Sequence, residues 1–381
     1  MKEYDLLVIG GGLIGCSVAW QSARRGMSVL LVERGDVGRE ATHAAGGMLA
    51  PLSEADQDDP FLQLCRQSLA LYAGFAQTLQ QETGIDVEYW AAGTLYLSLT
   101  GEDDEELESR HRWQSAAGLR IERLTSAEVL AREPGLNPEL RWALRFPDDH
   151  QVNNRCLIRA LHSAARLAGV EFYTQTAVRR LLIESHGGEQ RAVGVVTDRG
   201  DLKASTVVLA AGSWSSQLLD TVTSQPGAPY QVVPVRGQMV AVEMPRQALR
   251  HVIYSRRGYL VPRRDGRLIA GSTTELVGYD RRLTPAGIAS VVGRAEEIMP
   301  AFAGQPVLEM WAGLRPRSAD LLPVLGADPV ISGLIHATGH YRNGVLLAPL
   351  TGQLVADLVT GTEPAINLAP FSPARFVAGS D

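Results

Sequence analysis

The sequence has few cysteines, no long apolar run and no block of basic residues. Its three cysteines, Cys16, Cys65 and Cys156, lie far apart, which provides neither a CxxC metal-binding pair nor an even disulfide framework. Such cysteine usage predicts a reducing, cytoplasmic setting. The sequence contains no run of about 18 apolar residues, so we expect no membrane span. A formal charge of −6 without a long Lys/Arg run argues against a nucleic-acid binder.

The length and composition indicate a globular protein with more than one lobe. The chain has 381 residues, of which 45% are hydrophobic and 20% are charged. This balance does not fit intrinsic disorder, and 38 glycines and 20 prolines do not fit a collagen-like repeat. A chain of this length has room for about two or three lobes.

The first forty residues predict a strand, a glycine turn, a helix and a second strand. Residues 4–9 are apolar on both faces, which is typical of a buried strand in a parallel sheet. Residues 13–25 have apolar positions near helical spacing, and Gly26 is a plausible helix stop. Residues 28–32 then predict the second buried strand.

The turn between the first strand and the helix reads Gly10-x-Gly12-x-x-Gly15, the spacing of a dinucleotide-binding turn. In such a turn the glycines allow a tight bend, close approach of a pyrophosphate and close helix packing. Glu33, at the end of the second strand, is placed to accept hydrogen bonds from an adenosine ribose. An ordinary glycine turn with a solvated Glu33 is the alternative, and the turn alone does not choose between NAD and FAD.

Later segments favour a flavin. Residues 39–51 are small and glycine-rich, which suits a backbone that passes close to an extended ligand. Residues 206–211 predict a core strand that ends at Gly212. Residues 334–338 predict a strand, and the glycine turn 339–344 then opens a helix. The N-terminus of that helix would suit the electron-rich N1/C2=O edge of a reduced flavin.

The cofactor segments are separated along the chain, so we expect two interleaved domains. The FAD-binding domain is assigned to residues 1–85, 146–220 and 315–381, and the substrate-binding domain to residues 86–145 and 221–314. Within these ranges, residues 102–117 predict a helix. Strands are predicted at 231–242, 259–262, 267–271 and 307–311, and residues 263–267 predict a hairpin turn.

Six segments together resemble the D-amino-acid oxidase family of flavoproteins. They are VIGGGLIG (8–15), AAGGMLAP (44–51), LAAGSWS (209–215), GYLVPRRDGRL (258–268), WAGLRP (311–316) and GHYRNGVLLAP (339–349). The resemblance implies an α/β fold in which a Rossmann-like FAD-binding domain carries an inserted α+β substrate domain built on a mixed or antiparallel sheet. It also implies noncovalent FAD.

Within the family, the chain is most similar to the members that oxidise glycine for thiamine biosynthesis. That similarity implies oxidative deamination of glycine, small N-substituted glycines or small D-amino acids by hydride transfer to flavin N5. The products would be a 2-oxo acid such as glyoxylate, ammonia or an amine, and hydrogen peroxide, with the imine serving thiazole formation. It further implies O2 as co-substrate and a homo-oligomer, with a tetramer suggested.

The resemblance assigns cofactor-binding residues by position. At the pyrophosphate it places Gly10, Gly12, Leu13, Ile14 and Gly15, at the adenosine Glu33 and Arg34, and at the adenine Val178. Gly212 lies in the central glycine turn, and the residues along the ribityl chain and flavin are Ala41, Thr42, Gly46, Gly47 and Met48. Beside the isoalloxazine ring it places His340, Tyr341, Arg342, Asn343, Gly344, Val345 and Leu346.

The candidate substrate residues are Tyr259, Arg315, Arg342 and Met48. A substrate carboxylate needs a planar two-donor cation and a directional hydroxyl, which Arg315 and Tyr259 provide. Thr273 and Thr274 are further candidates for the pocket wall. We assign no catalytic side chain, because the flavin carries the reaction and the proton can pass to water.

Other readings remain open. The histidines His43, His150 and His340 show no metal-ligand spacing, so we expect no metal site. A sarcosine or D-amino-acid oxidase is the nearest alternative. The sarcosine group commonly attaches FAD to a cysteine in the C-terminal half, where this chain has none. A flavin-linked dehydrogenase with another electron acceptor, and a flavin-binding protein with incidental activity, are the further alternatives.

Overall fold

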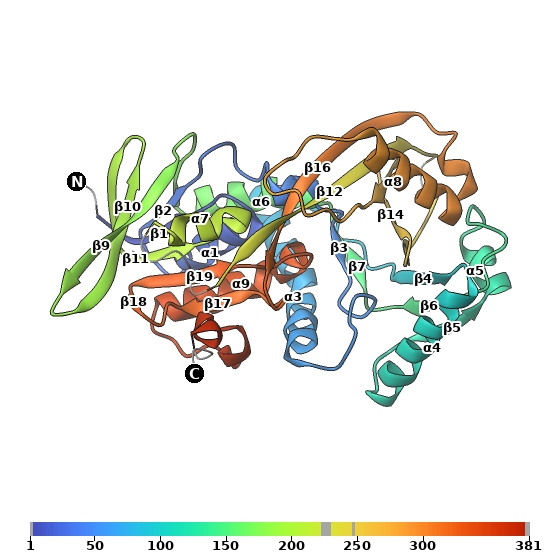
Figure 1. Ribbon diagram of the computed structural model, residues 1–381, viewed down its shortest axis with the longest axis horizontal. Coiled ribbons are helices and arrows are strands. Elements are labelled where there is room, and N and C mark those ends of the chain that lie inside the picture. The colour runs from blue at the N-terminus through green and yellow to red at the C-terminus, as the bar shows by residue number, and fades with distance from the viewer. Residues whose placement is uncertain (1–2, 222–229, 246–247, 378–381) are drawn as a thin grey trace.

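The computed structural model describes residues 3–221, 230–245 and 248–377. In Figure 1 a nine-stranded sheet and its helices form the left-hand lobe, and an eight-stranded sheet forms the right-hand lobe. The long strands β12 and β16 run between the two lobes, and both chain ends lie in the left-hand one.

The nine-stranded sheet has a parallel centre. Its main path is β17 (Val324–Ala327), β19 (Leu334–Thr338), β11 (Gly200–Leu209), β1 (Glu3–Ile9), β2 (Val29–Val32) and β8 (Glu171–Tyr173). The neighbours from β19 to β8 pair in parallel. Off this path lie β9 (Val178–His186), β10 (Glu189–Thr197) and β18 (Ile331–Ser332).

Both faces of this sheet are covered, one by helices and the other mainly by the β9–β10 hairpin, which explains the unbroken apolar runs in β1 and β2. One face packs against α1 (Leu13–Ala23), α3 (Pro60–Thr83), α6 (Asn154–Leu167) and α9 (Gly344–Val359). The other face packs against β9, β10 and the short α7 (Ser215–Leu219), which follows η1 (Gly212–Trp214). The C-terminal 3₁₀ turns are η3 (Ala369–Phe371) and η4 (Pro373–Phe376).

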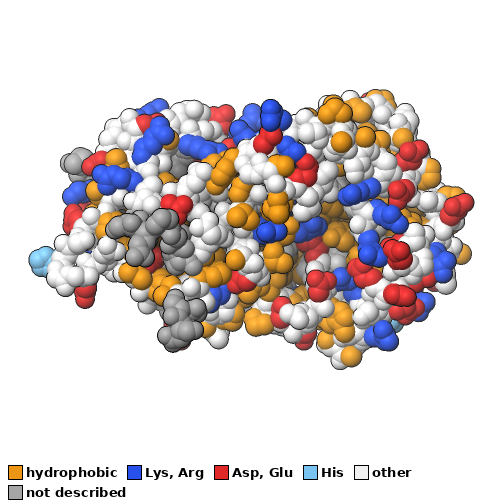
Figure 2. Space-filling model, viewed as in Figure 1, with side chains coloured by type: hydrophobic (Ala, Val, Ile, Leu, Met, Phe, Trp, Pro, Cys, Tyr) orange, Lys and Arg blue, Asp and Glu red, His pale blue; other side chains and the backbone are white. Residues whose placement is uncertain are grey.

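The eight-stranded sheet is mostly antiparallel. Its order is β16 (Val307–Ser318), β12 (Val232–Glu243), β15 (Arg267–Gly271), β14 (Gly258–Pro262), β13 (Val252–Ser255), β4 (Thr94–Ser98), β6 (Trp142–Phe146) and β5 (Glu122–Thr125). The associated helices are α4 (Gly101–Ala116), α5 (Ser126–Arg132), α8 (Pro285–Ile298) and η2 (Pro300–Phe302). Acidic and basic side chains alternate over the right-hand lobe (Figure 2), in agreement with the ion pairs that α4 makes through Glu106 and Glu108.

A small ladder joins the two lobes. Strand β3 (Met48–Leu49) pairs antiparallel with β7 (His150–Gln151), and the short helix α2 (Ala41–Ala44) precedes β3. These elements place the glycine-rich segment next to the eight-stranded sheet.

The predicted elements are confirmed, with shifts at their ends. The first helix is two residues shorter than expected, because Arg24 caps it and Gly26 turns with φ of 86°. The predicted hairpin turn connects β14 and β15. The strand predicted at 307–311 continues to Ser318, because Gly313 and Pro316 pair opposite Gly237 and Pro234 of β12. Among the described residues, no helix is both long enough and apolar enough to cross a membrane.

Candidate active site

A cavity of about 540 Å³ lies where the two sheets meet. It opens at the carboxyl ends of β1, β2 and β11 and extends to one face of the eight-stranded sheet. Ligands of open α/β sheets bind at this edge. The cavity wall includes residues from Ile9 to Val345, so the fold assembles it from distant parts of the chain.

The turn after β1 can approach a phosphate group closely because it is built from glycines. The chain packs so tightly around Gly10 and Gly15 that no other residue fits there. A Cβ on Gly10, which has φ of 108°, would lie 2.5 Å from the Ala210 oxygen. A Cβ on Gly15 would lie 1.9 Å from the Gly10 oxygen, so Gly15 lets α1 approach β1 closely. Helix α1 then begins directly at the cavity, and its first N–H groups and positive dipole end suit an anion.

Glu33 and Arg34 lie at one end of the cavity. The Glu33 carboxylate accepts hydrogen bonds from the backbone N–H groups of Gly11 at 2.7 Å and Gly35 at 2.9 Å, which fixes its position beside the turn. The Arg34 guanidinium stacks 3.6 Å from the centre of the Trp214 ring. Val178 lines the same end.

The glycine-rich segment is held from behind by a buried arginine. Arg263 Nη2 donates to the Gly46 oxygen at 2.7 Å and to Asn154 Oδ1 at 3.2 Å. Burial lowers the pKa of Arg263 to about 10, so the side chain stays charged at neutral pH. Because a Cβ on Gly47 would lie 2.1 Å from the Val152 oxygen, only glycine allows this approach.

The turn before α9 closes the far side of the cavity. Gly339 has φ of 73°, and Asn343 caps α9, which begins at Gly344. The His340 ring is buried, with Nε2 at 3.1 Å from Thr351 Oγ1, and burial lowers its pKa to about 3. His340 is therefore neutral at ordinary pH, and its ring is positioned by Thr351.

These features fit FAD. A glycine cradle and a helix N-terminus suit a pyrophosphate, Glu33 suits a ribose, and the N-terminus of α9 suits the electron-rich edge of a flavin. Between these segments in the chain, Gly46 and Gly47 line the cavity without side chains.

Arg315 lines the cavity without a carboxylate partner among the described residues. Its Nη2 donates to Ser272 Oγ at 2.6 Å and its Nη1 to the Thr273 oxygen at 3.3 Å. Gly237 lies directly beneath the guanidinium, since a Cβ there would be 2.3 Å from both Nη atoms. Its positive charge is thus available to an anionic ligand.

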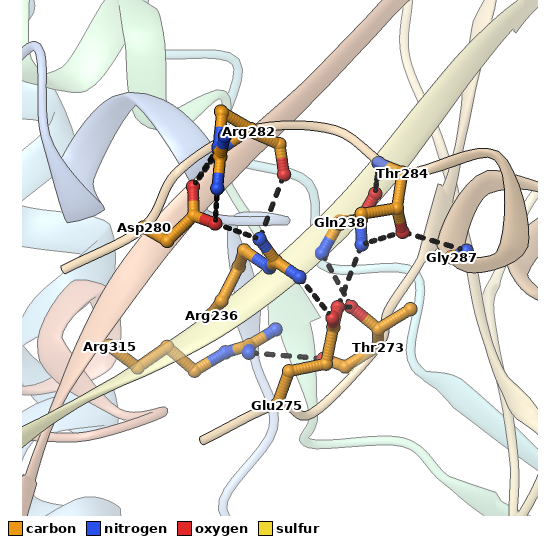
Figure 3. Close-up of polar contacts among 9 residues, drawn as sticks. All are labelled: Arg236, Gln238, Thr273, Glu275, Asp280, Arg282, Thr284, Gly287 and Arg315. Atoms are coloured by element: carbon orange, nitrogen blue, oxygen red, sulfur yellow. Dashed lines mark hydrogen bonds and ion pairs between the residues drawn. The ribbon is translucent and has the colours of Figure 1, made fainter. Parts of the chain in front are cut away.

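A buried polar cluster supports the Arg315 side chain (Figure 3). Thr273 Oγ1 accepts from the Gln238 N–H at 2.9 Å and also bonds Glu275. Glu275 in turn pairs with Arg236, which is 4% exposed. Burial opposes ionisation of Glu275, but its hydrogen bonds, above all that from Arg236, lower its pKa to about 2.

Tyr259 lies between Arg315 and a second arginine. A Cβ on Gly271 would be 2.6 Å from the Tyr259 ring, and Gly271 precedes Ser272, the partner of Arg315. On the other side, Tyr259 pairs across β13 and β14 with Tyr254, which bonds Arg342 Nη2 at 3.2 Å.

Arg342 differs from Arg315 in having a carboxylate partner. Its Nη2 lies 2.8 Å from Glu54 Oε1, and this pairing holds the pKa of Arg342 above its usual range. Glu54 also lines the cavity.

The cavity brings together nearly all the residues assigned from the sequence. Tyr259, Arg315, Arg342 and Met48 line it, as do the assigned cofactor residues with two exceptions. Gly15 packs against Gly10 and Leu346 is buried in the helical core, so neither faces the cavity. Thr273 and Thr274 are also outside the lining, and Thr273 instead supports Arg315.

Four further residues of the site, Glu54, Tyr254, Arg263 and Gly237, were not predicted from the sequence. Arg263 stood within a quoted segment, but only as part of a hairpin signal. Gly237 and Gly313 face each other in β12 and β16, and that pairing is visible only once the strand register is known. Glu54 contacts a residue 288 positions away, and no local pattern indicates such a pair.

Comparison with known proteins agrees with this site. The model of the DAO family, described as FAD dependent oxidoreductase, matches residues 5–358. The chain is 37% identical over 377 residues to glycine oxidase from Geobacillus kaustophilus, with 98% of each chain covered. It is 37% identical to the bifunctional protein ThiO/ThiG of Synechocystis sp., covering 98% of this chain and 54% of that protein.

A solved structure gives the same result. The crystal structure of glycine oxidase from Geobacillus kaustophilus superposes with a TM-score of 0.92 at 36% identity, covering 98% of this chain and 99% of that one. The chain therefore belongs to the DAO family of FAD-dependent oxidoreductases.

Proposed function

We propose that the chain catalyses FAD-dependent oxidative deamination of glycine, and of small N-substituted glycines or small D-amino acids. The products are a 2-oxo acid, which is glyoxylate for glycine, ammonia or an amine, and hydrogen peroxide. The similarity to glycine oxidases over nearly the whole chain supports this substrate class. We further propose that the imine supplies thiazole formation in thiamine biosynthesis, as the likeness to a ThiO/ThiG protein suggests.

One observation carries the proposal: Arg315 has only neutral partners and lies in the same cavity as Tyr259. A guanidinium and a phenol can together bind a carboxylate through charge-assisted hydrogen bonds. Gly46 lies beside the Tyr259 ring and Gly237 beneath the Arg315 guanidinium, and both line the cavity with Met48, which supports a small substrate.

The protein contributes mainly orientation. Arg315 and Tyr259 would hold the carboxylate, and the backbone around Arg342 would orient the amine, so that the α-carbon faces the cofactor. When bound, FAD supplies the two-electron acceptor at N5, and overall glycine, O2 and water become glyoxylate, ammonia and hydrogen peroxide. The proton released by the amine passes to water.

In this proposal each of the two sheets belongs to a different domain. The nine-stranded sheet with its helices corresponds to the proposed FAD-binding domain, 1–85, 146–220 and 315–381, and most of the eight-stranded sheet to the proposed substrate-binding domain, 86–145 and 221–314. Strand β16 crosses the boundary, so Arg315 lies in the eight-stranded sheet. We propose that FAD is held noncovalently, which the absence of all three cysteines from the cavity lining supports. We also propose a cytoplasmic protein that forms a homo-oligomer.

Anaerobic reduction tests the function directly. We expect glycine, sarcosine or D-alanine to bleach the flavin absorbance of the purified yellow protein, with glyoxylate formed from glycine. Arg315→Ala should raise KM for glycine by about 10- to 150-fold, because about 1.5 to 3 kcal/mol of charged hydrogen bonding is lost. An unchanged KM in a folded, FAD-loaded variant would remove Arg315 from the carboxylate site.

The electron acceptor needs its own measurement. An oxidase releases one hydrogen peroxide per glyoxylate in air. Turnover that depends on an artificial acceptor, with no peroxide, would instead identify a flavin-linked dehydrogenase.

A further inference from the structure

The two arginines at the substrate end of the cavity differ in charge balance. Arg315 donates only to neutral oxygens, whereas Arg342 is paired with Glu54 at 2.8 Å. The cavity therefore presents one available cation and one neutralised pair.

The two arginines lie at opposite ends of one line of contacts. Arg315 bonds Ser272, the adjacent Gly271 packs on the Tyr259 ring, and Tyr259 is paired with Tyr254 across the sheet. Tyr254 then bonds Arg342. A carboxylate bound at Arg315 and Tyr259 thus leaves the rest of the substrate facing the Arg342–Glu54 pair.

Glu54 is held in place by its backbone. The buried Asp149 accepts from the N–H groups of Leu52 at 3.0 Å and Ser53 at 2.8 Å, and Gln114 donates to the Leu52 oxygen at 2.8 Å. Arg110 donates to the oxygen of Ala55. These contacts support the backbone on both sides of Glu54, whose side chain is 13% exposed and pairs with Arg342 at the cavity wall.

We propose that Glu54 is a specificity-determining residue: it masks Arg342, so the site takes amino acids with one anionic group and excludes those with a second anionic group on the amine. This inference rests on the proposed function, since it assumes that Arg315 binds the substrate carboxylate. An added anion meets the Glu54 carboxylate, and like charges brought together in a partly buried site repel strongly.

Two unreactive ligands test the charge selectivity on the holoenzyme without turnover. Methoxyacetate mimics sarcosine, and diglycolate mimics iminodiacetate, with oxygen in place of the amine. Their Kd values are read from the perturbation of flavin absorbance at low ionic strength. We expect the wild type to bind diglycolate about tenfold more weakly than methoxyacetate.

Substitution of Glu54 should reverse that preference. In Glu54→Gln, which keeps the shape and a hydrogen-bond acceptor, we expect diglycolate to bind about tenfold more tightly while methoxyacetate changes less than about threefold. The kcat/KM ratio of iminodiacetate to sarcosine should rise in parallel. Adding Arg342→Gln should abolish the gain.

Asp58→Asn is the matched control, because it removes one negative charge from an exposed position of the same segment outside the cavity lining. It should leave the Kd ratio unchanged. A Glu54→Gln ratio equal to the wild-type ratio overturns the inference. So does wild-type binding of diglycolate as tight as that of methoxyacetate, a result that needs no variant to fold.

A failure of the proposed function can be distinguished from a failure of the role assigned to Glu54. If no small amino acid reduces the flavin, the catalytic assignment is wrong, while the two ligands still report whether Glu54 sets the charge preference. If glycine reduces the flavin and the ratios do not move, only the role of Glu54 is wrong.

Discussion

At the residue scale, the position of the Arg315 guanidinium requires glycine at position 237. The guanidinium lies where any Cβ at position 237 would be, only 2.3 Å from both terminal nitrogens. The opposite strand carries Gly313 at the paired position. Gly313 makes space for Ala44 of α2, whereas Gly237 makes space for the flat cation, and only glycine at 237 leaves Arg315 aimed into the cavity.

Gly237→Ala should displace this guanidinium. We expect KM for glycine to rise about tenfold or more, with a smaller change in kcat, because about 1 to 3 kcal/mol of overpacking falls on the carboxylate-binding group. Steady-state kinetics of the FAD-loaded variant measure it. Gly74→Ala is the control: a Cβ there meets nothing within 4 Å, so KM should stay at the wild-type value. An unchanged KM for Gly237→Ala would show that Arg315 tolerates the methyl group.

Residue-scale prediction from sequence succeeded where chemistry and motif coincide. Arg315 and Tyr259 stand in short segments of recognisable pattern, and both line the cavity. Glu54 has no such pattern, and its position depends on the buried Asp149 and on α4. Its role follows from tertiary contacts, which local sequence does not encode.

At the scale of elements, the segment between β15 and α8 connects the lobes. Glu275 holds Arg236 and Thr273 on the side of the eight-stranded sheet. Further along, Tyr279 donates to the Ser213 oxygen at 2.9 Å, and Arg281 pairs with Glu40 on the cofactor side. The segment therefore connects the cofactor lobe, through Tyr279 and Arg281, to Thr273, which accepts a hydrogen bond from Arg315.

Glu275→Gln should loosen this segment. We expect a loss of about 2 to 3 kcal/mol of unfolding free energy, because Arg236 stays buried with only Asp280, at 3.5 Å, as a carboxylate partner. Urea unfolding measures it. The double variant with Arg236→Met should lose less than the sum of the single variants, since it leaves no buried charge unpaired.

The pH dependence has a definite sign. The folded-state pKa of Glu275 is about 2, below its ordinary value of 4.5, so its contribution is present above about pH 4.5 and is lost as pH falls toward 2. Glu275→Gln should therefore lose less stability than the wild type over that acid range. If the free energy of unfolding fell by the same amount in the two proteins between pH 4.5 and pH 2, the ion pair would not have the role assigned to it.

Elements were predictable where periodicity is local. The first strand, turn, helix and second strand follow from apolar runs and glycines alone. Strand β16 was predicted too short because Gly313 and Pro316 disfavour a strand in isolation. Pairing along the whole of β12 overrides that preference, and it does so by matching glycine to glycine and proline to proline.

For the whole molecule, the cavity makes FAD a structural link as well as a cofactor. Its walls come from the turn after β1, the 41–48 segment, the turn before α9 and the face of the eight-stranded sheet. A ligand that binds all of these in the folded state and none in the unfolded chain stabilises by mass action, about 2.7 kcal/mol at 100 times its Kd. For a chain of 381 residues, removal of FAD held at that concentration should therefore lower Tm by about 3 °C.

The loss of stability on FAD removal should also be confined to the segments around the cavity. Hydrogen exchange should rise in the segments 39–48 and 340–345, which contribute to the cavity wall, while β4 and β6, which lie outside it, keep their protection. Adding FAD should restore both Tm and protection, and adding NAD should restore neither. A uniform rise in exchange would mean that FAD removal unfolds the chain globally. No change at all would mean that the cavity walls are rigid without the cofactor, and that protein contacts such as the β3–β7 ladder and the Arg281–Glu40 pair suffice to hold the lobes together.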